Sequence, residues 1–114
     1  MASFVIDYFE ISAANAGTSG AFFEAAFGFS LKPYGPDYVE IGGAGVLGGV
    51  NGDKDDQAQS TVIGIRTDDI AAAESSVVSA GGAITRKAYQ YPGGTRFFFR
   101  EPGGNELMVY QPAE

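Results

Sequence analysis

Two glutamates, Glu10 and Glu106, are the side chains of this sequence best placed for acid–base chemistry inside apolar strands. The apolar stretch FVIDYF precedes Glu10, and LMVY follows Glu106. Two carboxylates on neighbouring strands act as acid and base when burial separates their pKa values. Alternatively, each carboxylate forms a structural ion pair with Arg66 or Arg100. The residue types alone leave both interpretations open.

The composition excludes several other kinds of chemistry. The 114 residues include no Cys and no His. Disulfides, cysteine zinc sites and thiol nucleophiles are therefore excluded, together with the commonest general base and metal ligand. The formal net charge of −7 repels phosphate backbones, so we expect no nucleic-acid partner. We also expect a cytoplasmic protein without a membrane partner, because no signal peptide and no apolar stretch of about 20 residues is visible.

The glycine-rich run GGAGVLGGVNG (42–52) invites comparison with a phosphate-binding loop. It lacks GKS or GKT, and it precedes an acidic loop instead of a helix, so a nucleotide site is disfavoured. A strand with so few side chains is better explained by the close approach of a helix, a partner chain or a ligand.

The first half of the chain predicts one helix between strands. Residues 4–11 are rich in Phe, Val, Ile and Tyr, which is typical of a strand. Helical spacing predicts a helix over 16–27, ended by Gly28. Extended segments follow at 29–31, 38–41 and 44–50, before an acidic loop at 51–60. The side chains expected to face the sheet from the helix are Ala16, Ser19, Phe23, Ala26 and Phe27.

The second half repeats this plan. A strand at 61–67 precedes a helix that Asp68 or Asp69 caps and that runs through Ala80. Three strands follow at 83–90, 95–101 and 106–111. The halves align at an offset of 54, which places Tyr8 on Val62 and Gly28 on Gly82. We therefore predict an internal duplication within one domain spanning 1–114, with modules at about 4–52 and 60–111 joined by the acidic loop.

Three motifs in order resemble the vicinal oxygen chelate superfamily, which includes glyoxalase I, bleomycin-resistance proteins and extradiol dioxygenases. They are FEI (9–11) with GAFFEAAFGF (20–29), TDDIAAAESSVVSAGGAI (67–84), and FFFREPGGNELMVYQP (97–112). The resemblance covers nearly the whole chain. It implies an α+β fold of two tandem βαβββ modules that form a cupped mixed sheet with helices on the outer face. A ferredoxin-like dimeric barrel is the rival fold, but it would have four strands where the sequence indicates about eight.

The resemblance also implies four metal-ligand positions, usually filled by His, Glu or Gln. In this sequence they fall on Tyr8, Val62, the region of Gly48, and Met108. Tyr is a poor ligand for a hard divalent cation, and Val, Gly and Met offer it almost nothing. We therefore expect no metal and no other cofactor.

Side chains that share a face with these positions would line the cup. On the seventh predicted strand, either Arg96, Phe98 and Arg100 or Phe97 and Phe99 face inward. An apolar and aromatic wall with a few charges suits an organic ligand. The alternative is that these residues are ordinary core or dimer interface. The candidate ligand-binding residues are Tyr8, Glu10, Val62, Arg66, Phe98, Met108 and Tyr110, and the candidate catalytic residues are Glu10 and Glu106.

Three functions follow from this resemblance and from the residues. The leading hypothesis is metal-free binding of a small hydrophobic or planar organic molecule by a homodimer. The second is a glyoxalase-like lyase, isomerase or dioxygenase with an atypical oxygen-ligand site or metal-free acid–base chemistry by Glu10 and Glu106. The third is a structural module whose role is dimerisation.

Overall fold

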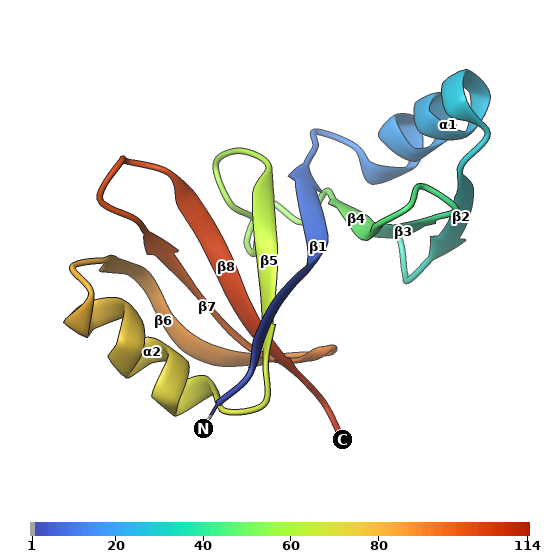
Figure 1. Ribbon diagram of the computed structural model, residues 1–114. Coiled ribbons are helices and arrows are strands. Elements are labelled where there is room, and N and C mark those ends of the chain that lie inside the picture. The colour runs from blue at the N-terminus through green and yellow to red at the C-terminus, as the bar shows by residue number, and fades with distance from the viewer. Residues whose placement is uncertain (1) are drawn as a thin grey trace. The chain divides into compact units, whose positions relative to one another are not determined.

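The computed structural model describes residues 2–114 and contains eight strands and two helices (Figure 1). Two compact units divide the chain. The first, Tyr8–Val62, is called the N-unit. The second joins the stretch Met1–Asp7 to Ile63–Glu114 and is called the C-unit, and Met1 itself lies outside the described residues.

The N-unit holds most of β1 (Phe4–Ser12), then α1 (Ala16–Phe27), β2 (Ser30–Pro33), β3 (Tyr38–Gly42) and β4 (Leu47–Asn51). Its strands lie in the order β2-β3-β4-β1, with β1 and β4 parallel and the other pairs antiparallel. β4 begins three residues later than predicted, because residues 43–46 form a bend.

The C-unit follows the same plan. It contains β5 (Val62–Thr67) except for its first residue, followed by α2 (Ile70–Ser79), β6 (Ala83–Tyr91), β7 (Gly94–Arg100) and β8 (Glu106–Pro112). The order is β5-β8-β7-β6, and again the first and last strands of the repeat are parallel neighbours. The predicted α+β fold of two βαβββ repeats is therefore confirmed.

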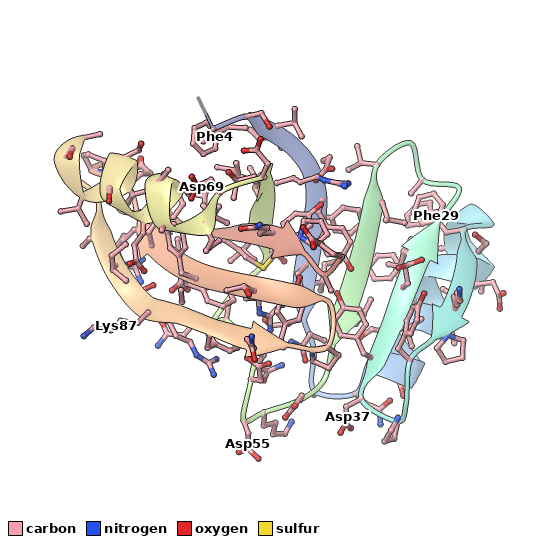
Figure 2. All side chains as sticks on the ribbon, turned by 90° about the horizontal axis from the view of Figure 1, so that it is seen from below. Phe4, Phe29, Asp37, Asp55, Asp69 and Lys87 are labelled. Atoms are coloured by element: carbon pink, nitrogen blue, oxygen red, sulfur yellow. The ribbon has the colours of Figure 1, made fainter. Side chains whose placement is uncertain are left out.

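Matching caps begin the two helices. Asn15 accepts a hydrogen bond from Thr18 N at 2.9 Å, and Asp69 accepts one from Ala72 N at 3.0 Å. Figure 2 shows Asp69 at the start of α2. A capping side chain satisfies one of the backbone N–H groups that the first helical turn leaves without a partner. The caps stand 54 residues apart, so the predicted offset holds at this point of the fold.

The core of each unit lies between its helix and its sheet. In the N-unit it is mainly aliphatic, whereas in the C-unit phenylalanines fill it. The N-unit core contains Ala16, Val39, Ile41 and Val50, and the C-unit core contains Ala73, Phe97, Phe99 and Val109.

The prediction of which α1 residues face the sheet is partly wrong. Ala16 and Gly20 are buried and Phe23 packs on the core, but Phe27 is 62% exposed. Ala26 is exposed as well. Phe27 lies in the last helical turn, where its ring contacts Phe29 at 5.5 Å between centroids instead of entering the core. The helical spacing therefore predicted a buried face that extends one turn further than the structure shows.

Neither helix is long and apolar enough to cross a membrane, within residues 2–114.

Candidate functional site

The N-unit presents a polar cluster on the face of its sheet opposite α1. Successive strand residues point to opposite faces. Phe9 packs against the helix-side core, so Tyr8 and Glu10 lie on the other face, as the sequence predicted. On the neighbouring strands, Glu10 stands opposite Gly49, and Tyr38 stands opposite Asn51.

Glu10 is the centre of this cluster and is only 1% exposed. Its Oε1 accepts a hydrogen bond from the Tyr38 hydroxyl at 3.0 Å, and its Oε2 accepts one from Asn51 Nδ2 at 3.3 Å. A carboxylate removed from water requires such donors, because an unsatisfied buried charge is very costly. Each carboxylate oxygen therefore has a protein donor.

Asn51 connects Glu10 to the acidic loop. Its Nδ2 also donates to the Asp56 carbonyl at 2.7 Å, and its Oδ1 accepts from Asp53 N at 2.8 Å. Gln57 Nε2 donates to the Asn51 carbonyl at 2.9 Å and to the Ala13 carbonyl at 3.3 Å. The loop predicted as a solvated connection is thus hydrogen-bonded to the strand that ends in Asn51.

Tyr38 and Tyr8 extend the cluster as a pair of phenols whose hydroxyl oxygens lie 2.6 Å apart. Burial raises the pKa of Tyr38 far above its ordinary value, and the charge of Glu10 and the neighbouring Tyr8 add to this effect. The Tyr38 hydroxyl therefore keeps its proton at neutral pH. Both rings are only partly buried.

The absence of side chains at Gly48 and Gly49 has a local cause. A Cβ at Gly48 would overlap the Phe9 ring, and one at Gly49 would overlap the hydroxyls of Tyr38 and Tyr8. The prediction that a helix, a partner chain or a ligand approaches this strand was wrong at these two positions. Rings from the adjacent strands fill the space. Gly49, not Gly48, shares the face of Tyr8, since Gly48 lies opposite Phe9.

The C-unit shows which way the residues of β7 face. Phe97 and Phe99 pack with α2 in the core, so Arg96, Phe98 and Arg100 lie on the opposite face. On this face Phe98 stands opposite Met108. Both side chains are 2% exposed.

Arg96 lies among aromatic rings on that face and is only 3% exposed. Its Nε donates to the Tyr89 hydroxyl at 2.7 Å, and its Nη1 lies 3.6 Å from Met108 Sδ. The guanidinium carbon is 4.5 Å from the Tyr91 ring centre and 5.3 Å from that of Phe98. Ring faces attract cations at such distances. We call the five residues Arg96, Tyr89, Tyr91, Phe98 and Met108 the aromatic cluster.

Arg66 and Tyr110 stand opposite each other on β5 and β8, and both contact Asp7. The Tyr110 hydroxyl donates to Asp7 Oδ1 at 2.5 Å, and Arg66 Nη1 lies 3.8 Å from Asp7 Oδ2. Burial, followed by the bond to Asp7, raises the pKa of Tyr110. The partner of Arg66 is therefore Asp7 and not the predicted glutamate.

Glu106 has a local partner within the C-unit. It is half-buried and accepts a hydrogen bond from Thr85 Oγ1 at 2.7 Å. Arg100, the other predicted partner, donates to the Gly104 carbonyl at 2.8 Å. The acid–base partnership of Glu106 with Glu10 stays a prediction.

The predicted site residues thus gather in small groups. Tyr8 joins Glu10 through Tyr38, Phe98 joins Met108, and Val62 is a 1% exposed side chain without a polar atom. The predicted site residues did not include Tyr38, Asn51, Tyr89 and Tyr91. Alternation along residues 38–42 and 47–51 places Tyr38 and Asn51 on one face, but only the strand register shows that they meet Glu10.

The family described as the Glyoxalase/Bleomycin resistance protein/Dioxygenase superfamily matches residues 5–109. No curated protein gives a significant match.

Solved structures share the fold at low sequence identity. A structure described as an NAD-dependent benzaldehyde dehydrogenase from Legionella pneumophila has a TM-score of 0.80 at 12% identity, covering 94% of this chain and 99% of that one. A glyoxalase/bleomycin resistance protein/dioxygenase superfamily member from Vibrio splendidus has a TM-score of 0.68 at 20% identity, covering 99% and 100%. Methylmalonyl-CoA epimerase from Mycobacterium tuberculosis has 0.67 at 13%, covering 96% and 88%. At these identities the likeness concerns the fold.

The residues at the metal-ligand positions implied by the resemblance do not fit a hard divalent cation. The Tyr8 hydroxyl is bonded to Tyr38, Val62 carries no donor atom, and the fourth-strand position on the Tyr8 face is Gly49. The remaining position is the thioether of Met108, which lies against Arg96. Oxygen and nitrogen ligands are what such cations prefer. Within residues 2–114, no three Asp or Glu side chains gather as a metal-binding group.

Proposed function

The chain belongs to the Glyoxalase/Bleomycin resistance protein/Dioxygenase superfamily, and from this membership we propose that it binds a small, planar or hydrophobic organic molecule without a metal ion. The observation that carries the proposal is the aromatic cluster of the C-unit. There Tyr89 and Tyr91 are partly exposed, while Phe98 and Met108 lie buried beside the same guanidinium.

The chemistry of this cluster suits a flat ligand. Tyrosine rings offer apolar faces on which another ring can stack at little cost in side-chain entropy. Arg96 is fixed by Tyr89 and by Met108, so a planar group stacked on the rings would meet a positioned cation. A mainly apolar surface with a few oriented polar groups is typical of sites for organic ligands.

A thermal-shift panel of planar aromatic compounds, run in EDTA, tests this proposal. A ligand that binds only the folded protein raises Tm in proportion to its occupancy. We expect compounds that raise Tm in the wild type to lose this effect in Tyr91→Leu. They should retain it in the control Tyr34→Leu, whose ring is 50% exposed in the N-unit. If no compound in the panel raises Tm, the proposal fails.

A second candidate function is metal-free acid–base catalysis of the lyase or isomerase type. The observation in its favour is the buried Glu10 carboxylate, which a phenol and an amide hold in place. Assays on dicarbonyl–thiol adducts and catechols, with and without Ni, Mn, Fe or Zn, would test it. An activity that survives EDTA and is lost in Glu10→Gln supports this candidate, and inactivity under all conditions argues against it.

We also propose that the protein acts as a symmetric homodimer in the cytoplasm. Three consecutive apolar residues of β1, Phe4, Val5 and Ile6, are 48%, 52% and 67% exposed. An exposed apolar run of this kind favours association. Light scattering at micromolar concentration tests the dimer, and a monomer would contradict it.

A further inference from the structure

Asn51 and Gly52 form the only Asn–Gly pair in the sequence, and such a pair is chemically labile in a flexible chain. The backbone nitrogen of the glycine attacks the side-chain carbon Cγ of the asparagine, because no Cβ hinders its approach. A new N–Cγ bond forms, the Cγ–Nδ2 bond breaks, and Nδ2 leaves as ammonia with the proton that water carries from the attacking nitrogen. Water then opens the resulting succinimide ring to aspartate or isoaspartate.

The fold explains why this labile pair is present. Asn51 joins Glu10 to the acidic loop through its side-chain amide. A Cβ at Gly52 would lie 3.0 Å from the backbone nitrogen of Ala16, which is tighter than an ordinary contact. Glycine therefore fits against the start of α1, and both members of the pair have a structural role in the N-unit.

In the folded N-unit, hydrogen bonds hold both ends of the peptide group that joins the two residues. The Gly52 nitrogen donates its proton to the Asp37 carbonyl at 2.7 Å. The Asn51 carbonyl accepts from Ala13 N at 2.8 Å and from Gln57 Nε2 at 2.9 Å. Ring closure requires this peptide group to turn until the nitrogen faces Asn51 Cγ, so these bonds oppose the reaction.

The side chain that would be attacked is fixed as well. Asn51 Oδ1 accepts from Asp53 N at 2.8 Å, and Nδ2 donates to the Asp56 carbonyl at 2.7 Å and to Glu10 Oε2 at 3.3 Å. Asn51 is only 3% exposed, so water has little access to it. The amide and the attacking nitrogen can therefore meet only after residues 51–57 leave these partners.

We propose that Asn51–Gly52 is a latent deamidation site, which the folded N-unit keeps closed and which reacts when residues 51–57 open. The product does not fit the closed structure. An aspartate at this position brings a second carboxylate to Glu10 and to the Asp56 carbonyl, where the amide acted as a donor. Isoaspartate adds a methylene group to the backbone, at the point where Asn51 stands opposite Tyr38. Deamidation thus turns a transient opening into a lasting loss of the N-unit fold.

Peptide mapping by mass spectrometry, after incubation of the wild type with and without guanidinium chloride, tests the closed state. The internal references are Asn15 and Asn105, which are exposed and precede Ala and Glu. In guanidinium chloride Asn51 should be the fastest of the three asparagines to deamidate. In the folded protein it should react at least about a hundredfold more slowly than in guanidinium chloride, because opening must come first. Equal rates in the two conditions would overturn the proposal, as would an Asn51 that is not the fastest when unfolded.

A variant that weakens the closed state without touching the reacting pair sharpens this test. Gln57→Ala removes one of the two donors to the Asn51 carbonyl. In the folded variant Asn51 should deamidate about tenfold faster than in the wild type, which is the scale of one hydrogen bond. The control Gln90→Ala, at an exposed position on β6, should keep the wild-type rate. A wild-type rate in Gln57→Ala would overturn the role of residues 51–57. If this variant does not fold, the wild-type comparison still decides.

The consequence of deamidation is tested with Asn51→Asp and the matched control Asn105→Asp. Both amides donate to a glutamate at 3.3 Å, but Asn105 and its bond to Glu101 are exposed. Urea unfolding should show that Asn51→Asp lowers the folding equilibrium constant by at least about a hundredfold, because two buried carboxylates then face each other. Asn105→Asp should change it little. An Asn51→Asp chain as stable as the wild type would overturn the claim that deamidation prevents refolding.

Discussion

The N-unit and the C-unit have the same order of elements and the same strand pairing, yet the sheet faces that point away from their helices carry opposite chemistry. The N-unit face holds a carboxylate, an amide and two phenols joined by hydrogen bonds. The C-unit face holds a guanidinium among rings and a thioether. The repeat therefore preserves the caps and the strand order, while the residues on the face away from each helix have diverged.

The helix-side cores of the two units differ too. Phe97 and Phe99 fill the C-unit core, with ring centres 6.2 Å apart. The buried residues of the N-unit core are aliphatic, and three partly exposed rings pack against them, those of Phe9, Phe23 and Phe29. Two other phenylalanines, Phe22 and Phe27, are 60% and 62% exposed. Phenylalanines are therefore buried in the core of the C-unit, whereas those of the N-unit are partly or largely exposed.

The largest expected effect comes from truncating a ring in the C-unit core. Phe97 is 0% exposed, so Phe97→Ala should lower the free energy of unfolding by about 3–5 kcal/mol. The matched change in the N-unit, Phe27→Ala, should cost less than about 0.5 kcal/mol. Urea unfolding of both variants measures the difference. Equal losses of stability would contradict the placement of Phe97 in the core and of Phe27 at the surface.

The next largest effect concerns the space that Gly49 leaves for the phenols. A Cβ at this position would lie 2.6 Å from the Tyr8 hydroxyl oxygen, so Gly49→Ala should destabilise the protein by about 1–3 kcal/mol. Adding Tyr38→Phe removes one of the overlapping hydroxyls and should recover part of this loss. The helix variant Gly17→Ala meets only ordinary contacts and should be neutral or stabilising. A well-tolerated Gly49→Ala would disprove the close approach.

The free energy of unfolding should depend on pH through one tyrosine in each unit, Tyr38 and Tyr110. The pKa values of Tyr38 and Tyr110 are raised in the folded protein. Above a pH of about 10 the unfolded chain loses these protons first, so it binds fewer protons and stability falls as the pH rises. Urea unfolding between pH 8 and 11 should show this fall, with a smaller slope in Tyr38→Phe than in the control Tyr34→Phe. Identical slopes in the two variants would count against a raised pKa of Tyr38 in the folded protein.

The smallest expected effect is that of the ion pair in the C-unit. Arg66 and Asp7 are 54% and 34% exposed, and their contact is 3.8 Å long. Solvent weakens such pairs, so Arg66→Gln should change the free energy of unfolding by no more than about 0.5 kcal/mol. Tyr110→Phe, which removes the hydrogen bond to Asp7, should cost about 1 kcal/mol. A larger effect from Arg66 than from Tyr110 would show that the charge, and not the phenol, stabilises this group.

Much of the fold was predictable because local signals determine it. Asn15 and Asp69 mark the helix starts, and alternation along residues 4–11 correctly placed Phe9 under the helix and Glu10 on the other face. The same signals could not show that Tyr38 and Asn51 bind Glu10. That contact depends on the register between β1, β4 and β3, which brings together residues 28 and 41 positions apart in the chain.

The sequence predicted several residues of the candidate site and the faces on which they lie, but it did not predict their hydrogen-bond partners. Tyr8, Phe98 and Met108 lie on the faces expected for them. The expected pairing of Arg66 with a glutamate was wrong, because the carboxylate of Asp7, which was not among the candidate residues, contacts both Arg66 and Tyr110. Arg96 was named only as one of two possible faces of its strand, since three successive phenylalanines give no alternation to read.

The central claim is that this member of the superfamily binds an organic molecule without a metal ion. Native mass spectrometry of the dialysed protein, combined with elemental analysis, tests it most directly. The account predicts less than stoichiometric metal and a mass increase of one organic molecule per chain when an aromatic compound that raises Tm is added. A divalent metal that stays bound at one equivalent per chain after dialysis would contradict it.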